Sequence, residues 1–263
     1  MGAGRTAAAV SVELSALVVI RNEEQRLAAC IDRLRFADEI VIVLDRCTDT
    51  SKEIARRYTD RLVEGTWERE GDRRNAGIDA CRGRWIVEVD ADEHVPEALA
   101  REIRQVIATG RFDWHEIPVD NYIGTRLVRW GWGGSYGKSA YPGLFRKGVK
   151  RWGPERVHPS LVRTGVQGPR LEARLDHYVD RNISDMIVRL DRYSSARALD
   201  LRDKGNIGSL APNARRLVTR FFKCYVLRKG YREGAFGFLI ALLAGLYPLL
   251  SYLKARYDAP EKR

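Results

Sequence analysis

Short apolar runs alternate with amphipathic stretches from Leu14 to about residue 110 of this 263-residue chain. The runs that resemble buried strands occupy residues 17–20, 39–44, 61–64 and 85–89. The stretches with helical character occupy residues 24–34, 51–58, 73–81 and 96–108. This alternation predicts an α/β domain whose sheet is crossed by helices.

The pattern changes beyond Gly110. Residues 113–128 have strand character, whereas residues 130–153 are rich in glycine and aromatic side chains and predict loops. Helical spacing returns at Ile183 and continues into the apolar tail. We therefore expect a flexible N-terminus at 1–13, an α/β domain at 14–180 with halves 14–110 and 111–180, and a helical extension at 181–263.

Composition narrows the range of partners. The 46 Lys and Arg residues outnumber the 35 Asp and Glu residues, and the net charge of +11 favours phosphates, nucleic acid or anionic lipid. The four cysteines have no paired spacing, which argues against a zinc site or a disulfide framework and fits a reducing compartment. Residues 1–13 contain no apolar segment typical of a secretory signal, so we expect a cytoplasmic body.

Polar side chains follow several predicted strands at the point where each strand ends. Asn22 follows the first strand, Asp45 ends the second, and Asp90 follows the strand at 85–89. Ligands bind at the carboxyl ends of strands in open α/β sheets, so these side chains should converge on one crevice. Asp90 and Asp92 offer oxygen ligands to Mg²⁺ or Mn²⁺, although Asp-x-Asp by itself more often marks a solvated acidic loop.

Further segments give the acidic motif its context. Residues 16–24 read ALVVIRNEE, 43–51 read VLDRCTDTS, 71–78 read GDRRNAGI, and 80–93 end in Asp-Ala-Asp-Glu. Together they resemble the glycosyltransferase family 2 enzymes, which have a GT-A fold with a Rossmann-like, nucleotide-sugar-binding mixed sheet. Leu44 and Arg46 depart from this resemblance, because they stand where the family has Asp and Gly. The resemblance implies a metal-dependent hexosyltransferase with a UDP-sugar donor and Mn²⁺ or Mg²⁺ as cofactor.

The resemblance also implies roles for single residues. Asp45 would accept a hydrogen bond from the uridine base, while the backbone near Ile20 and the side chain of Glu23 would line the nucleoside pocket. Asp90 would face the ribose or the metal, and Asp92 would be the principal metal ligand.

Other donor-binding residues follow from the same resemblance. Arg74, or else Arg73, would contact the base or the phosphates with its planar donor fork. The remaining donor-binding residues that the resemblance implies are Asn22, Asn75, Lys138 and Arg146. Asn22 could instead cap the helix that follows it, and a solvated basic surface is the alternative for Lys138 and Arg146.

The second half of the chain resembles, more narrowly, the lipopolysaccharide core enzymes that add glucose to an inner-core heptose. The matching segments are 133–136 (GGSY), 144–147 (LFRK), 156–158 (RVH), 176–178 (DHY) and 189–194 (RLDRYS). The acceptor would then be a lipid-linked saccharide such as the lipopolysaccharide inner core, and the transfer would be inverting. A polyprenyl phosphate is the alternative acceptor.

An inverting transfer needs a carboxylate that takes the proton of the acceptor hydroxyl. The subgroup has Glu after Val-His at this point, but Pro159 follows His158 here and cannot act as a base. Glu155 in the same loop and Asp176 further on are the candidates for this role. His158 either bonds to the backbone or holds the acceptor or donor phosphate.

The stretch from Ala235 to Leu253 contains no charged residue and has basic residues on both sides. We expect residues 221–253 to associate with a membrane surface, with the enzyme peripheral or monotopic on the cytoplasmic face of the inner (plasma) membrane. Glycines and Pro248 interrupt the run, which favours an interfacial or re-entrant segment. A single transmembrane helix and a buried core helix are the alternatives.

Two non-enzymatic interpretations remain. The basic and aromatic segment 126–150 would suit a nucleic-acid-binding protein, but that function leaves Asp90 and Asp92 unexplained, so no nucleic acid partner is expected. Pro159 would suit a degenerate transferase that acts as a scaffold.

Overall fold

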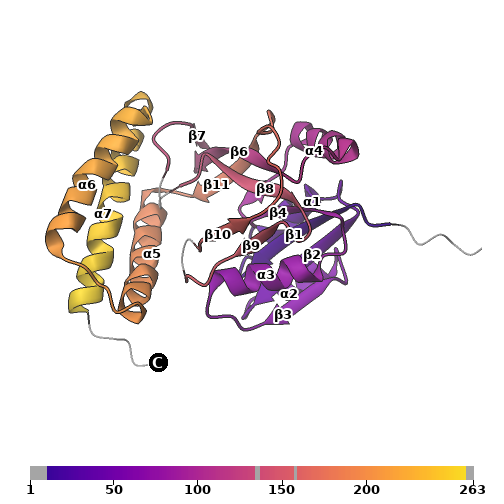
Figure 1. Cartoon of the computed structure of the whole chain (residues 1–263), viewed down its shortest axis with the longest axis horizontal. Coiled ribbons are helices and arrows are strands. Elements are labelled where there is room, and N and C mark those ends of the chain that lie inside the picture. Colours follow the sequence, from indigo (N-terminus) through magenta and orange to yellow (C-terminus); the bar gives the residue numbers. More distant parts are fainter. Residues whose placement is uncertain (1–10, 134–136, 157–158, 259–263) are drawn as a thin grey trace, which may run out of the picture.

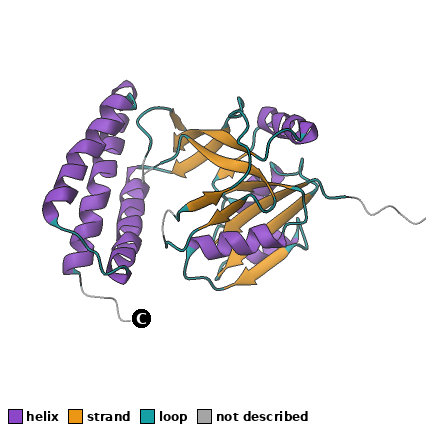
Figure 2. Cartoon of the chain, in the orientation of Figure 1, coloured by secondary structure: helices purple, strands orange, loops and turns teal. Residues whose placement is uncertain are grey.

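The computed structural model describes residues 11–133, 137–156 and 159–258. A mixed α/β part built on one large sheet is joined to long helices at the C-terminal end of the chain (Figure 1). Among the described residues, strands lie only in the first part, and the second part consists of helices joined by short turns (Figure 2). The predicted α/β class with a helical extension is confirmed.

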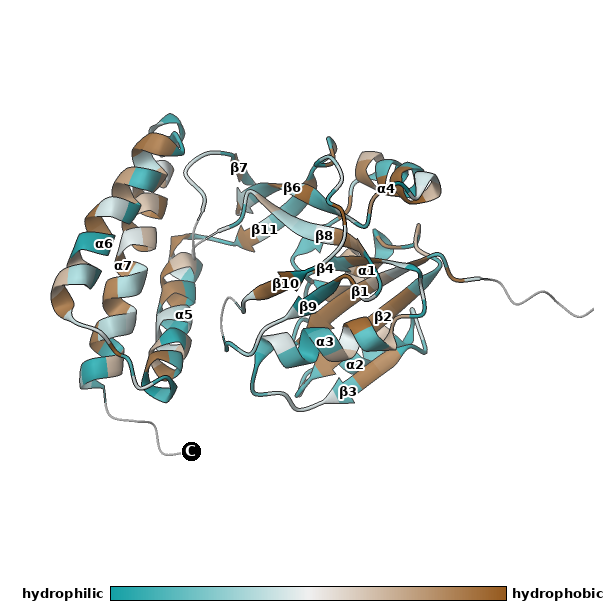
Figure 3. Cartoon of the chain, viewed as in Figure 1, coloured by the Kyte–Doolittle hydropathy of each residue, from teal (hydrophilic) through white to brown (hydrophobic). Residues whose placement is uncertain are grey.

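The N-terminal half of the sheet is parallel, in the order β3-β2-β1-β4. Its strands are β1 (Leu14–Ile20), β2 (Glu39–Asp45), β3 (Leu62–Gly65) and β4 (Trp85–Val89). The helices between them are α1 (Leu27–Asp32), α2 (Ser51–Arg56) and α3 (Glu70–Ala80). Every residue of β1 is buried, as in a strand covered on both faces, and β1 and β2 appear brown in Figure 3. The carboxyl ends of these strands therefore lie along one edge.

The other half of the sheet mixes strand directions. From β4 the order continues through β8 (Ala140–Arg146), β6 (Trp114–Ile123), β11 (Leu175–Asp180) and β5 (Glu93–His94), and β7 (Arg126–Val128) pairs with β6. A separate two-stranded ladder contains β9 (Lys150–Trp152) and β10 (Leu161–Arg163). Helix α4 (Glu97–Thr109) follows β5, begins after Pro96 and ends at Gly110, which has the left-handed φ of 58°.

The loop predicted for residues 130–153 is wrong from 140 onward, because β8 lies in the middle of the sheet between β4 and β6. Leu144 and Phe145 of β8 are fully buried. A Cβ atom on Gly143 would lie 2.7 Å from the side chains of Ile117 and Tyr141, so glycine permits close packing inside the strand. The glycine-rich composition that predicted a loop therefore reflects tight packing at this position.

The C-terminal helices are α5 (Ile183–Asp203), α6 (Leu210–Phe222) and α7 (Ala235–Tyr257), with a π-helical turn η2 (Lys223–Leu227) and a 3₁₀ turn η3 (Gly230–Glu233) between the last two. Helix α7 packs against both α5 and α6. The predicted interruption of the apolar run is wrong, because α7 continues through Gly245 and Pro248. A Cβ atom on Gly245 would lie 2.7 Å from the carbonyl oxygen of Leu217, so this glycine lets α6 and α7 approach closely.

Helix α7 is long and apolar enough to cross a membrane, and 56% of its most apolar 18-residue window is buried inside the protein. Its buried residues join α5, η2 and the end of β11 in one apolar cluster that includes Met186, Cys224 and Tyr247. The helix is thus the centre of the C-terminal part. Its other apolar residues lie at the surface of the protein.

Gly77 tests how closely α3 must approach the sheet. A Cβ atom there would lie 2.5 Å from Leu17 Cδ1 and 2.7 Å from Val43 Cγ2. We predict that Gly77→Val lowers the free energy of unfolding by about 1–3 kcal/mol, because extra volume in a packed core forces neighbours out of position. Urea denaturation measures this, with exposed Gln105→Ala on α4 as the control. Equal stability of the two variants would contradict the close packing.

Candidate active site

A cavity of about 590 Å³ opens where β1, β2 and β4 end. Val19, Asp45 and Asp90 from these strand ends line it, as expected of a ligand site in an open α/β sheet. Residues from α3, the segments before β8 and after β9, β11 and α5 complete the lining. The cavity therefore joins the first half of the sheet to the C-terminal helices.

Asp45 lines the cavity at the end of β2, and its side chain is almost fully buried. Its carboxylate accepts from Arg46 Nε at 2.9 Å, from the backbone amide of Trp67 at 3.1 Å, and from Arg73 Nη1 at 3.5 Å. Burial raises the pKa of Asp45, but the hydrogen bonds from Arg46 and Trp67 outweigh burial and hold that pKa below its usual range. Asp45 is thus an ionised acceptor at the base of the cavity.

Arg46 adopts an unusual backbone conformation, with a φ of 52°. A non-glycine residue seldom adopts this left-handed conformation. The bidentate contact between the Arg46 guanidinium and the Asp45 carboxylate accompanies it, at 2.9 and 3.0 Å. A ligand that hydrogen-bonds to Asp45 must compete with this guanidinium.

Asp90 lies just beyond β4 and contacts two cations of the cavity. Its Oδ1 is 2.9 Å from Arg74 Nη2, and its Oδ2 is 3.5 Å from Lys138 Nζ. Burial raises the pKa of Asp90, but the charges of Arg74 and Lys138 outweigh it and hold the pKa well below its usual range. Lys138 also pairs with the fully buried Glu93 and lies 4.1 Å from the ring centre of Tyr141.

A buried ion network lies beneath Asp90. Glu88 of β4 accepts from Arg74 Nη1 at 2.7 Å and from Lys150 Nζ at 2.6 Å, and Glu88 and Lys150 are almost fully buried. Burial raises the pKa of Glu88, but Lys150 and Arg74 outweigh it and lower that pKa. Arg74 also contacts Glu70, so one guanidinium connects α3 with β4 and with the residue after it. This network fixes the position of the Asp90 carboxylate.

Asp92 faces a histidine that was not predicted from the sequence. His177 Nε2 of β11 lies 3.5 Å from Asp92 Oδ2, and Arg26 Nη1 lies 3.6 Å from the same oxygen. The Nδ1 atom of His177 contacts the Asn121 side-chain oxygen at 2.9 Å, which orients the ring. Burial raises the pKa of Asp92, but His177 outweighs it and lowers the pKa. The sequence signal for His177 is the segment 176–178, in which Asp176 is a candidate for the base and His177 has no assigned role.

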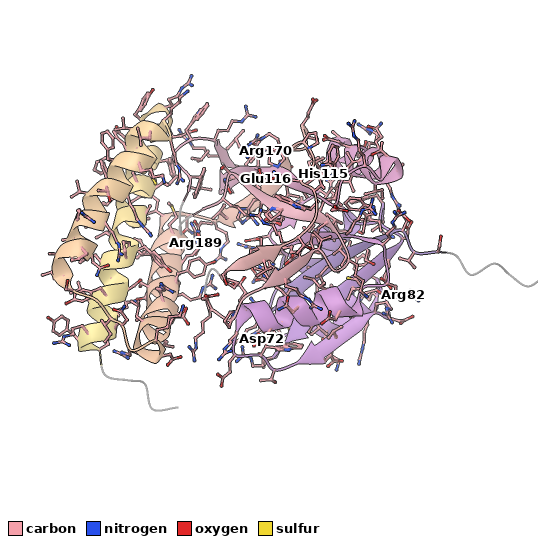
Figure 4. All side chains as sticks on the ribbon, in the orientation of Figure 1. Asp72, Arg82, His115, Glu116, Arg170 and Arg189 are labelled. Atoms are coloured by element: carbon pink, nitrogen blue, oxygen red, sulfur yellow. The ribbon has the colours of Figure 1, made fainter. Side chains whose placement is uncertain are left out.

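Residues of α5 also line the cavity, and sequence reasoning gave them no role. They are Arg189, Arg192, Tyr193 and Ala196. Arg189, labelled in Figure 4, extends from α5 toward the sheet, where it pairs with Asp180 at 2.8 Å. The segment 189–194 was a point of resemblance, so it contained the only sequence signal for these residues. The C-terminal helices thus contribute to the site directly.

Several predicted donor-binding residues lie elsewhere. Asn75 contacts the backbone of Trp152 through both side-chain atoms, at 2.9 and 3.0 Å, and ties α3 to β9. Arg146 contacts the carbonyl oxygen of Phe112 at 3.1 Å and stacks over Trp85, at the end of β4 opposite to Asp90. Neither residue lines the cavity, so the structure does not bring them together with Asp45 and Asp90.

The side chains at the end of β1 and in the turn after it have different surroundings. Asn22 accepts from the Thr48 amide at 2.8 Å, so it joins this turn to the turn after β2 and does not line the cavity. Ile20 is buried in the core, while Arg21 and Glu23 line the cavity.

The two candidates for the general base, Glu155 and Asp176, lie in different parts of the structure. Asp176 lies next to His177 on β11, so its side chain points to the opposite face, where it is near Tyr122 and does not line the cavity. Glu155 lies in the loop that brings Pro159 to the cavity, but its carboxylate accepts from the Ser160 amide at 2.8 Å. His158 lies outside the described residues.

The cavity contains a partial set of ligands for a divalent cation. Asp92 and His177 already face each other across 3.5 Å, whereas both oxygens of Asp90 contact cationic side chains. Among the described residues no group of at least three acidic, His or Cys side chains could hold a metal on its own. The pair fits a cation that takes its other ligands from a bound phosphate, as Mg²⁺ commonly does.

Comparison with known sequences gives one family. The family model described as Glycosyl transferase family 2 matches residues 15–147. The lipopolysaccharide core biosynthesis glycosyltransferase LpsC of Rhizobium meliloti (strain 1021) is 25% identical over 258 residues, which cover 92% of this chain and 91% of LpsC. An uncharacterized glycosyltransferase of Rickettsia bellii (strain RML369-C) is 23% identical, covering 93% of this chain and 86% of its own.

Solved structures share the fold. The crystal structure of S. aureus TarS 1-349 superimposes with a TM-score of 0.50 and 13% identity, covering 94% of this chain and 93% of that chain. A structure of the same protein in complex with UDP gives the same values. This likeness concerns the fold, a mixed α/β architecture with a curled central sheet.

The buried network beneath Asp90 allows a stability test. We predict that Lys150→Met lowers the free energy of unfolding by about 3–5 kcal/mol, because it removes one of the two cations that neutralise the buried Glu88. The double variant Glu88→Leu with Lys150→Met should recover part of this loss, since it also removes the buried charge. Urea denaturation of both variants measures the effect, and a single variant as stable as the parent would contradict the ion pair.

Proposed function

The chain belongs to glycosyl transferase family 2, and we propose that it moves a hexose from a UDP-sugar to a lipid-linked saccharide, with inversion, at the cytoplasmic face of a membrane. The observation that supports this proposal is that complementary groups line one cavity. The buried carboxylate Asp45 ends β2, and Asp92 with His177 lies beyond β4. Arg74 and Lys138 both contact Asp90. These groups suit a nucleoside, a diphosphate and a sugar.

The nucleoside would bind at Asp45. The uracil N3–H group is a donor, and the ionised Asp45 carboxylate would accept from it once Arg46 moves aside. Arg46 would then be free to approach the diphosphate, which its planar fork suits. Glu23 lines the same cavity and would accept from a ribose hydroxyl.

The diphosphate would lie over Asp90, Arg74 and Lys138. Lys138 would donate to phosphate oxygens, and Arg74 keeps Asp90 in place beneath them. Asp92 and His177 would hold Mn²⁺ or Mg²⁺, which when bound would neutralise the charge of the leaving diphosphate. TarS in complex with UDP has the same fold, which supports this type of donor.

The acceptor would enter between α5 and the segment that contains residues 153–156 and 159–160. Arg156 and Pro159 line the cavity from the loop, and Arg192 and Tyr193 line it from α5. LpsC is named for lipopolysaccharide core biosynthesis, which supports a saccharide acceptor with glucose as the hexose implied by resemblance. Glu155 is the only acidic residue of this loop and would take the proton of the acceptor hydroxyl.

Asp92 tests the metal and donor assignments. We predict that Asp92→Ala lowers sugar transfer more than about 100-fold, because stabilisation of the leaving group by a metal contributes several kcal/mol to the barrier. The variant should stay folded, since the side chain is 25% exposed and lies at the cavity surface. Release of UDP from UDP-glucose in the presence of the lipid-linked acceptor measures this. Exposed Asp72→Ala on α3 is the control, and full activity of Asp92→Ala would refute the assignment.

Glu155 tests the assignment of the base. Glu155→Gln should lower the rate of transfer by about 100-fold or more, while the affinity for UDP stays unchanged, because a general base acts only in the chemical step. Exposed Glu172→Gln serves as the control. Transfer at the parent rate by Glu155→Gln would exclude Glu155 as the base.

A further inference from the structure

An apolar stripe follows the outer side of α6 and continues into η2. Val218, Phe222 and Val226 are spaced by four residues and are 64%, 51% and 41% exposed. Residues at this spacing lie on one face of a helix. Helix α6 packs against α7 on its other side, through Leu217 and Phe221 among others. The stripe is therefore a surface of the protein and not part of its core.

Helix α7 extends this surface. Phe238 is 49% exposed, and Leu242, Leu249 and Leu253 are half-buried at helical spacing on the same side of α7. The Phe238 ring packs against Phe221 at 5.4 Å between ring centres, which joins the two stripes. The exposed faces of α6 and α7 thus form one apolar surface.

The end of this surface near β7 combines aromatic and basic side chains. Leu227 and Tyr231 are 65% and 54% exposed. Trp130, which is 37% exposed, lies beneath Lys229 and Arg232, whose charged groups are 5.4 and 4.8 Å from its ring centre. Tryptophan and tyrosine beside lysine and arginine are typical of the boundary between lipid headgroups and acyl chains.

The charges around the apolar surface have one sign. Between residues 204 and 257 the sequence has ten Lys or Arg residues and a single acidic residue, Glu233. Glu233 is buried, and its carboxylate accepts from the backbone amides of Arg129 and Trp130. Lys223, Lys229 and Arg232 are exposed. Negative charge is therefore absent from the exposed described residues of this segment, which complements an anionic partner.

We propose that this surface of α6, η2, η3 and α7 docks the enzyme on an anionic lipid bilayer, with the helices lying along the membrane. Helix α7 does not cross the bilayer in this arrangement, because its other side is the packed centre of the C-terminal helices. The sequence alone placed the membrane contact on residues 221–253, and the structure extends it along the outer face of α6 to Val218. The proposal rests on the proposed function only in placing the enzyme at a membrane.

The position of the surface fits the cavity. Helix α5 lines the cavity and also packs against α7, which forms part of the docking surface. One rigid group of helices therefore connects the lipid surface to the site at which a lipid-linked acceptor would react.

Vesicle co-sedimentation of the full chain tests the proposal. The vesicles are phosphatidylcholine alone or an equimolar mixture with phosphatidylglycerol. We expect binding to the mixed vesicles only, and release from them at high salt. The variant Val218→Glu with Phe222→Glu should lose binding, and Lys223→Glu with Lys229→Glu should weaken it at least about tenfold. The matched control is Val162→Glu with Val166→Glu, whose side chains are 62% and 61% exposed outside the C-terminal helices.

Binding of UDP with Mn²⁺ by each variant shows that the fold is retained and separates this proposal from the proposed function. Loss of vesicle binding with unchanged UDP binding supports the docking surface, even if no sugar transfer is detected. Equal binding by Val218→Glu with Phe222→Glu and by the control would overturn the proposal. A dimer in the absence of lipid that Phe222→Glu dissociates would assign the surface to a second copy of the chain and also overturn it. Retention of the protein on vesicles after carbonate extraction would show a membrane-crossing helix and would likewise overturn the proposal.

Discussion

The ion pairs that Glu88 forms with Arg74 and Lys150 determine the geometry of the cavity. They place three charges beneath the carboxyl end of β4, where each is costly unless the others are present. Arg74 then extends to Asp90, so the acidic motif cannot move independently of α3 and β9. Lys138 approaches Asp90 from the segment before β8. A cavity that binds a diphosphate needs such fixed positive charge, because donors held in place need not reorganise when the leaving group develops charge.

The features that follow from apolar runs and strand ends could be predicted from the sequence. Strands β1, β2 and β4 are continuous apolar runs, and parallel pairing brings Asp45 and Asp90 to one edge of the sheet. The match of the glycosyl transferase family 2 model over residues 15–147 covers the same part of the chain. Local pattern and family resemblance therefore agree over the N-terminal part of the chain.

The remaining features depend on contacts between distant residues. Whether Asp176 or His177 faces the cavity depends on the register of β11 with β6, and a shift of one residue reverses the answer. The glycines of β8 and α7 suggested interruptions, but they allow close packing that appears only when the neighbouring element is in place. Likewise, the apolar residues of α6 became a surface only once α7 was seen to cover the other side of the helix.

The proposed function requires that the cavity bind a uridine diphosphate together with a divalent cation. Calorimetric titration of the full chain with UDP, with and without Mn²⁺, tests it most directly, and GDP serves as the control nucleotide. Mn²⁺ should then tighten UDP binding by at least about tenfold, or roughly 1.4 kcal/mol, because Asp92 and His177 would hold the cation only together with a phosphate. UDP affinity that does not change with Mn²⁺, or equal affinity for GDP, would contradict it.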